Sequence, residues 1–206
     1  MSSSFVSSLT PHTEAKGHQK NTTLSNADVF FMVLTASWSM LFGTFILSFL
    51  LARVKTPIWP PLEIGQFPVE LPIISTLAIL LSSFFVQKAY NAFILNKAET
   101  QKIDHQNYLN FKFYWGLGIL LGFFFTLLQG VSLYKWIELG IDYRSHVYAS
   151  SVYFLITFHA LHLFLGLGAL LYFYFNQKKA EYLKLSTWFW HFLAVVWIAI
   201  FMAIAL

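Results

Sequence analysis

The stretch that decides the fold runs from Val147 to Phe175 and reads VYASSVYFLITFHALHLFLGLGALLYFYF. It carries no Asp, Glu, Lys or Arg, and it exceeds the roughly 20 residues with which a helix crosses the hydrocarbon layer of a membrane. His159 and His162 lie in its middle, three residues apart, on one face of the predicted helix. Because an imidazole in hydrocarbon needs a polar partner, this pair marks candidate functional residues.

Apolar blocks on either side of this stretch predict four further transmembrane helices. The chain is 57% hydrophobic and 11% charged, whereas soluble domains are about half apolar and about a quarter charged. Backbone groups in lipid must be bonded within the segment, and no alternating pattern indicates a barrel. The sequence therefore predicts an all-α polytopic membrane protein: a mobile cytoplasmic tail over residues 1–27, then a five-helix transmembrane domain over 28–206, with spans at 29–51, 71–95, 113–134, 147–175 and 187–206.

The basic residues are divided unevenly between the two sides of the predicted membrane domain. Nine lysines fall on the side of the N-terminal tail, and only Arg53, Lys55, Lys135 and Arg144 fall on the other. The excess of lysine and arginine in cytoplasmic loops predicts that the N-terminus lies in the cytoplasm and Leu206 on the opposite side of the membrane. The net charge of +4 is thus a topological signal, and no nucleic-acid partner is expected.

Motifs of soluble enzymes are missing. The chain has no cysteine, which excludes disulfides, thiolate metal sites and iron–sulfur clusters. It has no phosphate loop, dinucleotide fingerprint or nucleophile elbow. We therefore predict no catalytic residue and no metal site in this chain.

Three membrane histidines nevertheless invite a metal or haem hypothesis, since His191 lies in the last span between Trp190 and Phe192. A neutral imidazole can instead bridge helices, because one ring nitrogen donates a hydrogen bond and the other accepts one. We favour this structural role over contact with lipid head groups, and both over ligation of a metal. Gln129 in the third span is likewise predicted to bond between helices rather than to bind substrate.

Several stretches, read in order, resemble subunit III of the haem–copper terminal oxidases over nearly the whole membrane part, in the shorter form that lacks the first two helices. They are Trp59-Pro60-Pro61, Leu71–Leu77 with Ser82-Ser83, Phe125–Gln129, Tyr148–Phe154 running into Phe158–His162 with Gly166, and Trp190-His191-Phe192 with Val195-Val196-Trp197.

This resemblance implies an accessory subunit of cytochrome c oxidase without a redox centre of its own. Family members pack against subunit I, which reduces oxygen, and hold structural phospholipid in a cleft between two helix groups. Haem and copper are then expected in partner subunits, with subunit II and others completing the complex. The family's His-x-x-His pair and Trp-His-Phe motif match His159, His162 and His191, and in the family these are not metal ligands.

The chain also departs from the family. The membrane-embedded glutamate usual in the helix equivalent to the first span is replaced by Trp38, and Ala194 and Ser132 stand at or near the places of other acidic residues. The core of every span lacks Asp and Glu, and Asp28 is the carboxylate nearest to the first helix. We therefore expect no proton relay through the interior of this subunit.

The candidate residues for structural bonding or lipid contact are His159, His162, His191, Trp190, Trp197, Trp59 and Gln129. Trp59 follows Pro57 in a proline-rich loop and is predicted to be an interfacial aromatic. Two alternatives stay open at this point. One is subunit III of a quinol oxidase, or the related membrane protein that accompanies nitric oxide reductase. The other is a stand-alone transporter, although the repeats and intramembrane charges typical of transporters are missing.

Overall fold

The protein is a bundle of five long helices. The computed structural model describes residues 25–55, 68–99, 105–141, 143–144, 147–176 and 180–205. The helices are α1 (Asn26–Lys55), α2 (Glu70–Glu99), α3 (His105–Glu138), α4 (Val147–Phe175) and α5 (Ala180–Ala205). All five are long and apolar enough to cross a membrane. The predicted all-α, five-helix class is confirmed.

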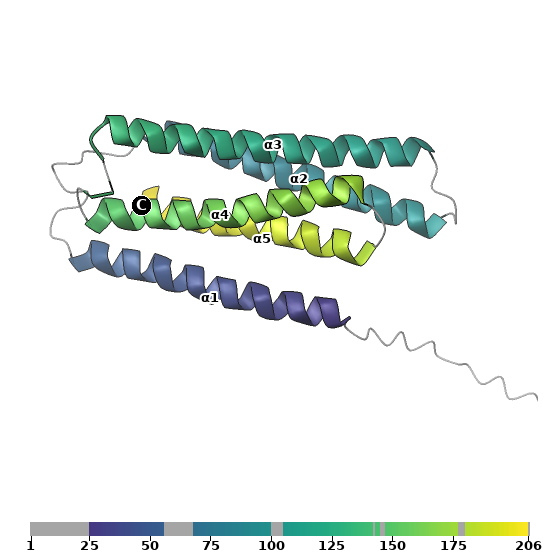
Figure 1. The fold of residues 1–206 in the computed structure, drawn as a ribbon, viewed down its shortest axis with the longest axis horizontal. Coiled ribbons are helices and arrows are strands. Elements are labelled where there is room, and N and C mark those ends of the chain that lie inside the picture. Colours follow the sequence, from purple (N-terminus) through teal and green to yellow (C-terminus); the bar gives the residue numbers. More distant parts are fainter. Residues whose placement is uncertain are drawn as a thin grey trace, which may run out of the picture.

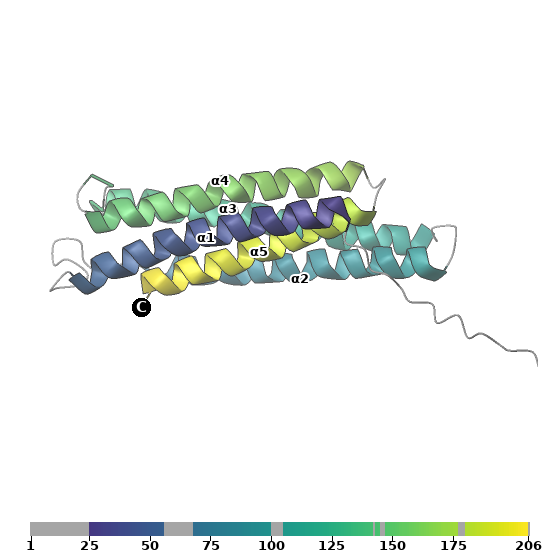
Figure 2. The same cartoon turned by 90° about the horizontal axis from the view of Figure 1, so that it is seen from below.

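The helices run alternately up and down along one common axis (Figure 1). α5 contacts α1, α2 and α4, whereas α1 contacts only α4 and α5 among the described helices. Figures 1 and 2 show α1 at the margin of the bundle, and the paired ends of α2 and α3 projecting beyond the other helices at one end. Within α1 only Phe42 and Phe49 are buried.

The helices are longer than the hydrocarbon layer is thick. At about 1.5 Å per residue, the 34 residues of α3 and the 26 residues of α5 span roughly 51 and 39 Å, against a hydrocarbon layer of about 30 Å. The ends of both helices therefore reach the head-group layer, where long amphipathic side chains are stable. Lys88 of α2 shows such a contact, because its Nζ lies 4.3 Å from the ring centroid of Tyr114 on the neighbouring helix.

α3 ends in a glycine-dependent turn. Gly140 has a φ of +79°, which a residue with a Cβ rarely adopts. Its N–H donates to the carbonyl of Ile137, and the N–H of Ile141 donates to the carbonyl of Trp136. These two bonds satisfy carbonyls that the helix end would leave free. The side chain of Ile141 is buried, and Tyr153 of α4 donates to its carbonyl at 2.8 Å, so the turn is tied to the next helix.

Candidate functional site

One face of α2 carries a row of polar side chains that bond to neighbouring helices. Its members recur at intervals of seven and four residues, which places them on one side of the helix. The row consists of Ser75, Thr76, Ser82, Ser83 and Gln87. The candidate residues Gln129, Trp190, His191 and Trp197 all bond to this row. The α2 polar row is therefore the place where the predicted site residues of α3 and α5 meet.

His191 bridges α5 and α2 with both ring nitrogens. Its Nδ1 is hydrogen-bonded to the hydroxyl of Ser83, and its Nε2 lies 2.8 Å from Oε1 of Gln87. Because the amide oxygen only accepts, Nε2 carries the proton and Nδ1 accepts from the serine hydroxyl. Gln87 in turn donates from Nε2 to Asn91 at 2.9 Å. Both polar positions of the neutral imidazole are thus satisfied by another helix.

Trp190 lies where four helices converge, and it is fully buried. Its Nε1 donates to Oγ of Ser82 at 3.0 Å, and that hydroxyl donates to the carbonyl of Gly118 at 2.6 Å. The benzene part of the indole fits between two glycines: a Cβ built on Gly122 would lie 2.7 Å from Cζ2, and one built on Gly166 would lie 3.1 Å from Cε3. The close packing of α3 and α4 around α5 therefore depends on the missing side chains of these two residues.

Two further bonds connect the α2 polar row to its neighbours. Gln129 of α3 donates from Nε2 to Oγ of Ser75 at 2.7 Å, and Trp197 of α5 donates from Nε1 to Oγ1 of Thr76 at 3.0 Å. Serine and threonine hydroxyls of transmembrane helices commonly bond across helices in this way. Gln129 and Trp197 are also buried. Both side chains therefore use their polar atoms within the bundle.

His159 and His162 are buried, and within the described part of the chain neither forms a hydrogen bond to another helix. Nδ1 of His162 lies 2.8 Å from the carbonyl of Phe158, one turn earlier in the same helix. Both ring nitrogens of His159 are without a hydrogen-bond partner among the described residues. The His159 ring instead stacks on Trp197, with ring centroids 5.7 Å apart. The three histidines therefore do not form one network, and aromatic packing is the main contact of the His-x-x-His pair.

Trp38 stands against His162 at the contact of α1 and α4. The two rings meet edge to face with centroids 4.9 Å apart, and Phe42 and Phe158 complete the surroundings of the imidazole. An aromatic side chain of α1 therefore faces this histidine. Trp59, the remaining candidate, lies outside the described residues.

An ion pair joins the first turns of α1 and α5. Nζ of Lys184 lies 3.0 Å from Oδ1 of Asp28, with the two side chains 33% and 18% exposed. The same Nζ lies 5.2 Å from the ring centroid of Trp188. Asp28 occupies the first turn of α1, where the helix dipole favours a negative charge. The acid nearest to the first span is thus used to join two helices.

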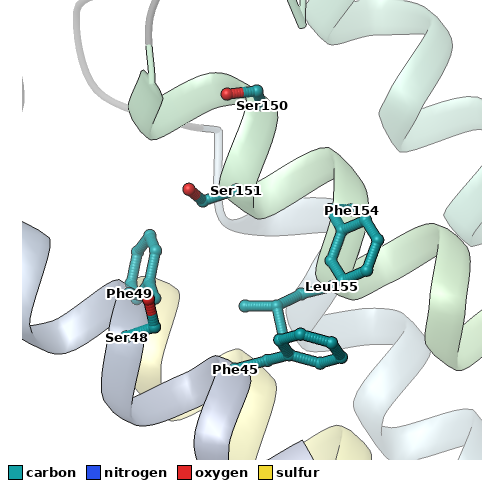
Figure 3. Close-up of a pocket in the computed structure, with 7 residues that line it drawn as sticks. All are labelled: Phe45, Ser48, Phe49, Ser150, Ser151, Phe154 and Leu155. Carbon is teal, nitrogen blue, oxygen red and sulfur yellow. The ribbon is translucent and has the colours of Figure 1, made fainter.

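The opposite end of α1 borders an open notch against α4 (Figure 3). The notch has a volume of about 320 Å³, and Phe45 and Phe49 of α1 face Phe154 and Leu155 of α4 across it. Ser150 and Ser151 line its upper side, and both hydroxyls donate to the carbonyl of Val147. The notch offers an apolar floor with hydroxyl oxygens at its edge, a combination that suits a lipid.

The role of His191 can be tested by replacing it with phenylalanine, which keeps a ring but removes both nitrogens. Each interhelical hydrogen bond in a membrane contributes about 0.6 kcal/mol on average and up to about 1.7, so we expect His191→Phe to lower the free energy of unfolding by about 1–2 kcal/mol. His162→Phe is the matched control, because Nδ1 of His162 bonds within α4 and, among the residues that the structure describes, His162 has no hydrogen bond to another helix. Titration with denaturing detergent measures both variants, and equal losses would contradict the bridging role.

The class of protein follows from these contacts. The described residues contain no group of three or more His, Cys, Asp or Glu side chains close enough to hold a metal ion. The buried polar atoms of α2, α3 and α5 are mostly engaged in bonds between helices or with their own backbone. The molecule is a multi-pass membrane bundle built around packing and interhelical hydrogen bonds.

Comparison with known proteins identifies the family. The sequence model for cytochrome c oxidase subunit III matches residues 5–206, and the chain belongs to this family. It is 32% identical over 158 residues to the probable cytochrome c oxidase subunit 3 of Rickettsia felis, covering 72% of this chain and 52% of that protein. The subunit 3 of Thermostichus vulcanus is 28% identical over 178 residues, covering 82% of each chain. The chain thus spans about half the length of the Rickettsia felis relative.

Proposed function

We propose that this chain is a non-redox accessory subunit III of a proton-pumping respiratory terminal oxidase, a cytochrome c oxidase. In this proposal it packs on subunit I, with subunit II and others in the same complex, and it stabilises the complex during aerobic electron transport. Haem and copper, and with them oxygen reduction, belong to the partner subunits. The observation that carries the proposal is the family match over residues 5–206, almost the whole chain.

The surface of the bundle supports a role among lipids and other membrane subunits. Large apolar side chains are exposed on the outer faces, for example Met40 at 76%, Leu127 at 67% and Val195 at 63%. Such faces are stable only against acyl chains or other transmembrane helices. We infer that α1, with an open notch on one flank and an open groove on the other, retains structural phospholipid.

We further propose a bacterial inner membrane with the N-terminus of the chain in the cytoplasm. The distribution of lysine and arginine supports this orientation. Lys88, Lys112 and Lys184 all belong to the side of the predicted cytoplasmic loops, and each lies within 5.5 Å of a tyrosine or tryptophan ring centroid. Lysine beside an aromatic ring is typical of the membrane interface.

Purification of the complex through a tag on this chain tests the proposal. We expect haem–copper subunits I and II to copurify, with haem absorption bands and oxidation of cytochrome c. His162→Ala is expected to loosen the contact of α1 with α4 and to lower the yield of intact complex, while the haem bands per complex stay unchanged. Phe164→Ala is the control, because this side chain is 58% exposed.

Three results would redirect the assignment. A shift of the haem bands in His162→Ala would contradict the structural role of the histidine. Copurified quinol oxidase or nitric oxide reductase subunits would move the chain to the alternative complex, for which the absence of acidic residues from the span cores is the motivating observation. A colourless protein without redox partners would favour a stand-alone transporter.

A further inference from the structure

A cavity of about 210 Å³ lies between α3 and α4, and one of its walls comes from α5. Its lining includes Phe125, Gln129, Gly130, His159, Phe164 and Trp197. Among the described residues that line it, none is an Asp, Glu, Lys or Arg. Gly130 and Phe164 are exposed on the surface of the bundle, so the cavity opens sideways towards the lipid.

The cavity lies near the middle of the membrane. Twelve residues of α4 precede His159 and sixteen follow it, which places the imidazole roughly 18 and 24 Å from the two ends of the helix. The hydrocarbon layer is about 30 Å thick. The polar groups of a phospholipid stay at the surface of this layer, so they do not reach the cavity. A molecule that hydrogen-bonds here has to carry its polar group into the hydrocarbon.

Two polar side chains of the cavity have hydrogen-bonding capacity left. His159 is 1% exposed, and neither of its ring nitrogens has a partner among the described residues. Ser75 donates its hydroxyl proton to the carbonyl of Pro72, so its Oγ accepts from Nε2 of Gln129. This bond uses the amide nitrogen of Gln129, and the amide oxygen keeps its capacity to accept. A buried polar atom without a partner costs free energy, which a ligand with matching groups would recover.

We propose that this cavity binds an uncharged aromatic alcohol of the phenol class. The ligand hydroxyl donates to Oε1 of Gln129, its oxygen accepts from the N–H of His159, and its ring packs among Phe125, Phe164 and Trp197. The site is new to this chain and goes beyond the proposed oxidase function.

Size and charge favour this class of ligand. An apolar cavity of about 150 Å³ holds benzene, so the larger volume here accommodates two fused rings. A charged ligand would be costly at this depth without a counter-charge. A hydrocarbon would leave both polar side chains unpaired. Aromatic walls favour an aromatic ring, because offset and edge-to-face contacts add to the burial of apolar area.

Equilibrium dialysis with the full chain in nanodiscs tests this proposal. The probes are tritiated 2-naphthol and its methyl ether 2-methoxynaphthalene, which keeps the ring and the oxygen but has no proton to donate. Empty nanodiscs measure how much of each probe dissolves in the lipid. We expect one molecule of 2-naphthol per chain above this background. At equal concentration in the membrane it binds about threefold to tenfold more tightly than the ether, as for one ordinary hydrogen bond.

Variants assign the binding to the cavity. Gln129→Met removes the acceptor, so we expect 2-naphthol to bind only as well as the ether, whose own affinity stays unchanged. His159→Phe removes the donor to the ligand oxygen and weakens both probes. Ala160→Phe fills the cavity and abolishes binding of both. Leu161→Phe is the matched control, because this side chain is 57% exposed on another side of α4.

Three results overturn the proposal: equal binding of the alcohol and the ether to the unmodified chain, no binding above empty nanodiscs, or a preference for the alcohol that survives Gln129→Met. A lipid acyl chain that fills the cavity gives the second of these results. The comparison of alcohol and ether needs no variant, so the test stands even where a variant fails to fold. Because the readout is binding to the chain itself, its outcome is separate from the copurification of redox subunits.

Discussion

Replacing Trp190 by alanine is expected to lower the free energy of unfolding by about 3–5 kcal/mol, the usual cost of truncating a fully buried tryptophan. The indole is 0% exposed, and it fills the space that Gly122 and Gly166 leave open on the two neighbouring helices. Its removal leaves a cavity at the convergence of α3, α4 and α5. It also leaves the hydroxyl of Ser82 without the donor from α5.

The same variant is expected to reduce the amount of intact complex recovered from membranes. Titration with denaturing detergent gives the free energy of unfolding, and the yield through a tag on this chain gives the recovery. Trp188→Ala is the matched control two residues away: this side chain is 47% exposed, so we expect its loss to cost less than about 1 kcal/mol. A similar loss in both variants would show that Trp190 is not central to packing.

The number and order of the helices could be predicted because transmembrane spans are long uninterrupted apolar runs. The bounds of the fourth span, 147–175, agree with those of α4. The ends of other helices could not be predicted from hydropathy alone, since these helices continue into the polar head-group layer. The predicted third span ended at Tyr134 and began at Phe113, whereas α3 runs from His105 to Glu138. The additional turns carry polar and aromatic residues that are stable at the interface but do not register as apolar.

The side of each helix that faces the core was not predictable from the apolar pattern. Three consecutive phenylalanines in α3 differ in exposure. Phe125 is fully buried, whereas Phe123 and Phe124 are 43% and 45% exposed. In water an apolar stripe marks the buried side of a helix, but lipid and core are equally apolar in a membrane. Only the contacts of neighbouring helices separate the two environments.

The interhelical bonds illustrate the same limit for polar residues. The histidines were expected to act alike, but among the described residues only His191 forms hydrogen bonds to a second helix, because Ser83 and Gln87 of α2 lie opposite it. A signal for the α2 polar row was present in the sequence as pairs of hydroxyl residues seven positions apart, Ser75-Thr76 and Ser82-Ser83. The resemblance to the family included these pairs without assigning them a role, since their partners come from the packing of α2 on α3 and α5.

α2 and α3 approach each other closely at Gly118. A Cβ on Gly118 of α3 would lie 2.6 Å from Cγ2 of Val86 and 3.4 Å from the carbonyl oxygen of Ser82. The carbonyl belongs to the backbone and cannot rotate away, and Gly118 itself accepts the bond from the Ser82 hydroxyl. Gly118→Leu must therefore push the two helices apart. We expect it to lower the free energy of unfolding by about 1–3 kcal/mol or more, as overpacking of a tight core does.

Gly130→Leu is the matched control on the same helix, because a Cβ there meets no atom within 4 Å. Thermal unfolding in mild detergent measures the effect. We expect the midpoint temperature of unfolding to be well below that of the control for Gly118→Leu. The double variant Gly118→Leu with Val86→Ala removes the nearest side chain and should recover part of the loss, whereas the Ser82 carbonyl still opposes full recovery. Equal midpoint temperatures for Gly118→Leu and Gly130→Leu would mean that the packing of α2 against α3 does not depend on close contact between their backbones. The α2 polar row would then have to hold the pair together through its hydrogen bonds alone.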